Sequence, residues 1–168
     1  MTDPVEWLGR WVDEGDRARL DEASVALTPS RSIGVAGAVI AWREHIAKID
    51  ADLDAAPDDR SVWGAHDLVA AVIMRDIVAE TAGLADPALL ATIEPAIAEV
   101  DEWFRRITEP DDDGCLDRVD GRPAEGRAWW WRRIPLRGPI REELRELYGH
   151  NQSPDPPGRI RWSQTHPR

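Results

Sequence analysis

The chain has 168 residues, of which 42% are apolar, and its formal net charge is −11. A chain of this length and composition can bury one hydrophobic core, so general disorder is not expected. No run approaches the roughly 18 apolar residues of a membrane span, and the N-terminus lacks the basic start and apolar run of a secretion signal. Cys115 is the single cysteine and cannot form an internal disulfide. These features predict a cytoplasmic protein without membrane association.

The charge is unevenly distributed. Residues 1–121 carry 11 basic and 27 acidic side chains, a net of −16, whereas residues 122–168 carry 10 arginines and 5 acidic residues, a net of +5. Lys48 is the only lysine beside twenty arginines, a bias typical of a GC-rich coding sequence, which lowers the weight of any single arginine. The two parts either bind different partners or pack on each other, and packing is the more economical interpretation.

The N-terminal part predicts a helix from Pro4 to about Leu27. Asp3 is a suitable N-cap and Pro4 suits the first helical turn. The apolar residues that share one helical face are Val5, Leu8, Trp11 and Val12. A break at Gly15 is the alternative to a continuous helix, and residues 28–30 end the segment.

Three further helices are predicted from apolar spacing. The clearest covers residues 33–56, and its seam consists of Val35, Val39, Trp42, Ile46, Ile49, Leu53 and Ala56. Small residues at its start indicate an end that the protein or a partner encloses. The next helix runs over about 62–84. The last begins at Asp86-Pro87, contains Pro95, and has on one face Ile93, Ile97, Val100, Phe104 and Ile107.

The connections between these helices are short, so neighbouring helices should be antiparallel. The sequence therefore predicts an all-α fold, a bundle of about four mostly antiparallel helices over residues 1–108. Glycine and proline are frequent over residues 109–150, which predicts a loop-rich segment packed on the bundle, with one short helix over 139–148. Residues 151–168 contain four prolines and are expected to form an extended tail.

Residues 109–120 resemble the twelve-residue calcium loop of EF-hands. The matching positions are the third, fifth, sixth, eighth and ninth, occupied by Asp111, Asp113, Gly114, Leu116 and Asp117. Glu109 and Asp120 depart from the pattern at the first and last positions, and Gly121 and Pro123 prevent the helix that should follow. We therefore expect a solvated acidic turn, with no metal ion and no other cofactor.

The other polar residues of the helices do not form a recognisable catalytic motif. In a bundle, His45 and His66 would lie about 10 Å apart along the axis, too far to share a metal ion. A looser polar layer at one height of the bundle would contain Glu44, His45, Asp76 and Glu94. A surface layer of ion pairs with Arg43 and Arg75 is the preferred interpretation of these residues. Cys115 lies among carboxylates, which blunt a thiol, so we assign no catalytic residue.

The most unusual stretch is three consecutive tryptophans followed by arginines. The residues that we predict to bind a partner are Trp129, Trp130, Trp131, Arg132, Arg133 and Arg137. Three successive side chains cannot all face one core, and tryptophan beside arginine is typical of interface hot spots. The alternative, equally weighted, is that two tryptophans hold the C-terminal part on the bundle while arginines pair with its acidic face. Trp162 could anchor the tail in the same way.

These observations favour a protein–protein interaction module, such as an adaptor, inhibitor or accessory subunit, that uses the Trp/Arg-rich segment to bind another protein. The alternative is a small helical-bundle enzyme or metal-binding protein that uses the polar layer. Nucleic-acid binding is the least favoured, because a body with a net charge of −16 repels phosphate. The apolar seams also allow self-association.

Overall fold

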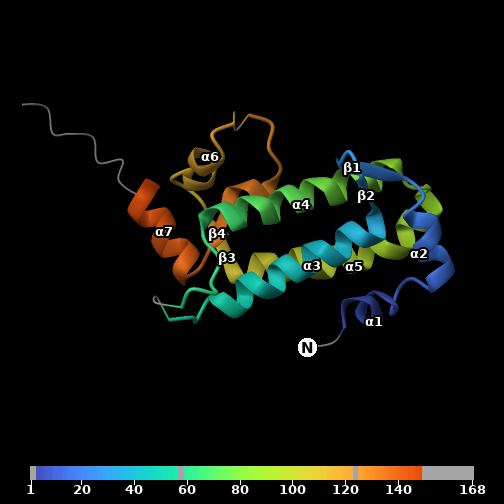
Figure 1. Cartoon of the computed structure of the whole chain (residues 1–168), viewed down its shortest axis with the longest axis horizontal. Helices are drawn as coiled ribbons and strands as arrows, with labels where there is room; N and C mark the ends of the chain where they lie inside the picture. Colours follow the sequence, from blue (N-terminus) through green and yellow to red (C-terminus); the bar gives the residue numbers. More distant parts are fainter. Residues whose placement is uncertain (1–2, 57–58, 123–124, 149–168) are drawn as a thin grey trace, which may run out of the picture.

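The computed structural model describes residues 3–56, 59–122 and 125–148, and the protein is mostly helical. Its centre consists of three long helices, α3 (Val35–Asp52), α4 (Ala65–Leu84) and α5 (Pro87–Ile107). They lie side by side, and successive helices run in opposite directions (Figure 1). None of the described helices is both long and apolar enough to cross a membrane.

The seam predicted for residues 33–56 forms the buried face of α3. Six of its members are at most 6% exposed: Val35, Val39, Trp42, Ile46, Ile49 and Leu53. Ala56, the last predicted member, lies beyond the helix and is exposed. α3 packs against both α4 and α5, so this face forms the middle of the core.

The two-residue connection between α4 and α5 is fixed by a helix cap. The carboxylate of Asp86 accepts hydrogen bonds from the backbone N–H groups of Ala88, at 2.9 Å, and Leu89, at 3.1 Å. Pro87 follows in the first turn, where the lack of a backbone N–H costs nothing. This pair predicted the start of α5, and the helix begins there.

The N-terminal part differs from the single helix expected up to Leu27. It forms two short helices, α1 (Pro4–Leu8) and α2 (Glu14–Leu20), and then an antiparallel hairpin of β1 (Ser24–Thr28) and β2 (Arg31–Gly34). The carboxylate of Asp13 caps α2 by accepting from the backbone N–H of Asp16 at 2.8 Å, which starts a new helix. In β1, exposed residues alternate with half-buried ones, the two-residue period of a strand, and the all-α expectation is wrong for this segment.

The C-terminal part is built around a second small hairpin. β3 (Thr108–Pro110) pairs antiparallel with β4 (Arg133–Pro135), with Glu109 opposite Ile134. Between these strands lie α6 (Cys115–Asp120) and the 3-10 helix η1 (Trp129–Arg132). α7 (Pro139–Tyr148) follows, and the extended tail expected for residues 151–168 lies outside the described residues.

Helix α7 is attached to the start of α4. Glu143 of α7 accepts a hydrogen bond from the backbone N–H of Ala65, at 2.7 Å, in the first turn of α4. A carboxylate at this place also interacts favourably with the positive end of the helix dipole. Ile140 and Leu144 are the buried residues of α7.

Helix α1 is attached to α5 through one carboxylate. Glu99 accepts hydrogen bonds from the indole Nε1 of Trp7 and from Nη2 of Arg10, both at 2.8 Å. Burial raises the pKa of Glu99, but these two hydrogen bonds, together with the positive charges of Arg10 and Arg43, outweigh it and hold the pKa below its ordinary value. A lowered pKa in the folded state means that the contact stabilises the protein above the ordinary glutamate pKa and is lost as the pH falls through the lowered value.

We predict that Glu99→Gln lowers the free energy of unfolding at pH 7 by about 0.5–1 kcal/mol, because the Glu99–Arg10 pair is half-exposed. The difference from wild type should shrink as the pH falls below about 4, where the wild-type carboxylate also becomes protonated. Urea unfolding at pH 7 and pH 3 measures this, with the exposed residue Glu94→Gln on the same helix as control. A deficit that is equal at both pH values would contradict the assignment.

Candidate functional site

The three long helices meet at a buried ion pair. Nε and Nη2 of Arg75 on α4 donate to the two carboxylate oxygens of Asp101 on α5, at 2.7 and 2.8 Å. Trp42 of α3 donates its indole N–H to the same carboxylate at 3.2 Å. Arg75 is 9% exposed and Asp101 7% exposed. The two charges therefore satisfy each other in the core, where an unpaired charge would be costly.

The tryptophan run is docked beside this ion pair. Asp76, the residue after Arg75, accepts hydrogen bonds from the indole N–H groups of Trp130, at 2.7 Å, and Trp131, at 2.8 Å. Trp130 is 8% exposed and Trp131 3% exposed. The guanidinium of Arg75 lies 4.3 Å from the ring centre of Trp130, so one turn of α4 provides both a carboxylate and a cation to the segment.

Trp129 points to a different environment from its two neighbours. It is half-buried, and its ring lies edge-on to that of Trp130, with centres 5.7 Å apart. The guanidinium of Arg105 on α5 covers it at 3.8 Å from the ring centre. Two of the three tryptophans are therefore enclosed by the protein, and the third has a face near the surface.

The arginines of the predicted partner-binding set have separate surroundings. Arg133 donates to the carbonyl oxygens of Arg105, at 3.1 Å, and Thr108, at 2.7 Å, and so closes the end of α5. Burial, together with the nearby charge of Arg105, lowers the pKa of Arg133. Arg137 is exposed and pairs with Asp54 at 2.7 Å, and Arg132 is exposed.

The structure does not bring together the four residues of the polar layer that was predicted from the sequence. Asp76 is occupied by the two indoles, and Nδ1 of His45 lies 2.7 Å from the carbonyl oxygen of Ala41. Glu44 and Glu94 are exposed and line two different hollows of the surface. Over the described ranges, no group of three or more His, Cys, Asp or Glu side chains is arranged to hold a metal ion.

In the acidic loop that resembles a calcium site, carboxylates bond to backbone N–H groups and arginines of the chain itself. Asp111 accepts from the backbone N–H groups of Cys115, at 3.0 Å, and Leu116, at 2.8 Å, which starts α6. Arg127 pairs with both Asp117 and Asp120. Hydrogen bonds from arginine outweigh burial and lower the pKa of the Asp120 carboxyl. The loop is therefore less solvated than we expected, because Arg127, which follows it, pairs with two of its acids.

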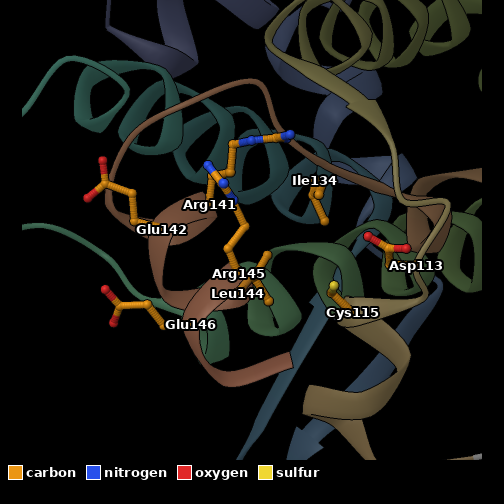
Figure 2. A pocket seen from close by; sticks show the side chains of 8 residues that line it. All are labelled: Asp113, Cys115, Ile134, Arg141, Glu142, Leu144, Arg145 and Glu146. Carbon is orange, nitrogen blue, oxygen red and sulfur yellow. The ribbon is translucent and has the colours of Figure 1, made fainter. Parts of the chain in front are cut away.

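A hollow of about 400 Å³ lies where α6 faces α7 (Figure 2). Cys115 and Asp113 line one side, and Arg141, Leu144 and Arg145 of α7 line the other. Burial raises the pKa of the Cys115 thiol, and a hydrogen bond from Arg118 only partly offsets this. A thiol that stays protonated at neutral pH is a poor nucleophile, so the hollow gives no support to catalysis by this cysteine.

A second hollow, of about 290 Å³, is a mostly apolar groove between α4 and α5. We call it the α4–α5 groove. Its apolar walls are formed by Val78, Ala79 and Ala82 of α4 and by Leu90, Ile97 and Ala98 of α5. The Arg75–Asp101 pair and Trp130 lie at one end, and Ala82 and Leu90 at the other. The tryptophan segment thus contributes to the wall of an open groove.

Comparison of the sequence and structure with family models, curated proteins and solved structures finds no match.

Sequence reasoning missed Asp101 and the role of Asp76. A signal for Asp101 was present, because it lies four residues after Ile97 and three before Phe104, on the apolar face of α5. A charged residue at such a position is typically paired. No comparable signal linked Asp76 to the tryptophans, since they are more than fifty residues apart.

We predict that Asp76→Ala lowers the free energy of unfolding by about 2–4 kcal/mol, because it leaves two buried indole N–H groups without an acceptor. Asp76→Asn keeps one acceptor oxygen and should cost about half as much. Urea unfolding followed by tryptophan fluorescence measures the effect, and Glu80→Ala, one turn further along α4 and exposed, is the control. Equal stability of Asp76→Ala and Glu80→Ala would show that the indoles are not held by Asp76.

Proposed function

We propose that this chain is a protein–protein interaction module, an adaptor, inhibitor or accessory subunit, that binds a segment of another protein in the α4–α5 groove. The observation that carries the proposal is an open groove with apolar walls between two helices, with Trp130 at one end. Grooves between helices bind amphipathic helices by accepting apolar side chains one turn apart. Tryptophan at such a site is typical of residues that dominate binding energy.

The Trp/Arg segment has two roles in this proposal. Trp130 contributes directly to the groove, and Trp130 and Trp131 together hold the segment on α4 through Asp76. Arg132 is exposed and is proposed to make further contacts with the partner, whereas Arg137 is engaged by Asp54. We place the interaction in the cytoplasm, where a buried free thiol such as Cys115 stays reduced.

Filling the groove should abolish binding without unfolding the protein. Ala98 is an exposed residue of the groove wall, so Ala98→Trp places a large side chain in the groove with little strain on the core. Ala88→Trp makes the same change at an exposed position of α5 that does not line the groove and lies on a different face of the helix. The two variants thus form a matched pair.

We predict that a tagged wild-type bait retains one protein in stoichiometric amount from a nuclease-treated lysate of its own cells. Ala88→Trp should retain it equally, and Ala98→Trp should lose at least about tenfold of it, a loss of about 1.4 kcal/mol of binding energy. Circular dichroism and thermal unfolding confirm that both variants are folded. Retention of the partner by Ala98→Trp, or no partner on wild type, would refute the proposal.

A further inference from the structure

A hollow of about 370 Å³ lies between the start of α1 and the second half of α3, two helices that pack against each other (Figure 1). This volume is within the range typical of small-molecule pockets. Its wall is mostly apolar and includes Pro4 of α1 and Ala47 and Ala51 of α3. The hollow shares no residue with the α4–α5 groove, so what it binds is independent of the proposed function.

The residue that distinguishes this hollow is Arg43. Its side chain lines the hollow and is only 8% exposed. Across the described part of the chain, its guanidinium forms no ion pair and donates no hydrogen bond. Its charge acts on Glu99, but the hydrogen bonds of Glu99 are to Trp7 and Arg10. A buried charge without a hydrogen-bonded partner is costly, so a guanidinium in this position is suited to pairing with an anion.

The guanidinium of Arg43 is accessible to a ligand in the hollow. Over the described residues, every side-chain nitrogen or oxygen that is fully shielded from solvent has a hydrogen-bond partner. The nitrogens of Arg43 have none, so they reach solvent, and the hollow provides the opening. The guanidinium carbon lies 4.9 Å from the ring centre of Trp7. An arginine stacked on an aromatic ring keeps its N–H groups for another acceptor, and the ring restricts its orientation.

The other charged groups of the hollow leave no second cation for a ligand. Nζ of Lys48 donates to both carboxylate oxygens of Asp52 and to the carbonyl oxygen of Ser61. One carboxylate oxygen of Asp3 caps α1 by accepting from two backbone N–H groups. Glu44 is exposed and lines the hollow, and in the described ranges it belongs to no ion pair. A ligand therefore meets one free guanidinium beside a carboxylate that disfavours a second negative charge.

We propose that this hollow binds a small organic molecule that carries one carboxylate and an apolar body. The carboxylate accepts two parallel hydrogen bonds from the guanidinium of Arg43, the geometry in which arginine binds carboxylates most strongly. The apolar body lies against Pro4, Ala47 and Ala51. Glu44 selects against ligands with a second negative charge.

A carboxylate of the chain itself is the alternative partner of Arg43. Asp58 and Asp155 are the two acidic side chains outside the described ranges. Met1 and Thr2, which directly precede Asp3, contain no side-chain carboxylate. The experiment therefore includes a full-length variant without these two acidic side chains.

The probe is 4-fluorobenzoate, with the neutral 4-fluorobenzamide of similar shape for comparison. Binding to the full chain is followed at pH 7 by fluorine NMR of the probe and by the indole N–H signals of the protein. We expect the benzoate to bind with a Kd below about 1 mM and at least about tenfold more tightly than the benzamide. The indole signal of Trp7, whose ring lies beside Arg43, should shift, whereas those of Trp130 and Trp131 should not.

Two variants and a matched control locate the site. Ala51→Trp fills the hollow from an exposed position of α3, and Arg43→Gln removes the charge. Each should weaken binding of the benzoate at least about tenfold. Ala70→Trp, at an exposed position of α4 outside the hollow, should leave binding within about twofold of wild type. Circular dichroism confirms that the variants are folded, and if Arg43→Gln is not, Ala51→Trp and the Trp7 signal decide.

Equal binding of the benzoate and the benzamide, or of the benzoate to wild type and Ala51→Trp, would overturn the proposal. Displacement of the benzoate by an equal concentration of inorganic phosphate would also overturn it, because the apolar wall would then play no part in recognition. If Asp58→Asn/Asp155→Asn in the full chain tightens binding of the benzoate at least about tenfold, one of these carboxylates occupies the site, and the proposal is likewise overturned.

Discussion

The carboxylate of Asp101 is the point on which the structure depends. It is buried where α3, α4 and α5 meet, and it accepts from both Arg75 and Trp42. Removing one member of a buried ion pair typically costs about 3–5 kcal/mol, because the other charge is left without a partner. The ion pair also determines how α4 and α5 are placed relative to each other. Helix α4 can slide along α5 only by breaking this pair, so the register of the two helices is fixed.

The position of the proposed binding surface follows from that register. Because Arg75 faces Asp101, the next residue, Asp76, is directed to the tryptophan segment, and Arg75 itself lies against the ring of Trp130. The segment is therefore docked at one height of α4, and the groove continues from there toward Ala82. In this account, the buried ion pair, the docked tryptophans and the α4–α5 groove form one unit. A change at the ion pair should alter the groove even though the pair is buried.

The sequence predicted the long helices well and the arrangement of the site poorly. The seam of α3 and the Asp86-Pro87 start of α5 are local patterns that the structure confirms. The hairpin at 24–34 was missed because a short apolar alternation was interpreted as a continued helix. For Trp129–Trp131, the sequence left exposure and docking open. The deciding partner, Asp76, is distant in the sequence, and no local rule connects them.

Hydrogen exchange of the indole N–H groups, followed by NMR of the wild-type chain, tests the central claim that Asp76 holds the tryptophan segment on the bundle. The account predicts that the indoles of Trp130 and Trp131 exchange far more slowly than that of Trp129, for which the described residues provide no acceptor. Exchange of Trp130 and Trp131 as fast as that of Trp129 would mean that the segment is not docked, and the account of the groove would fail with it.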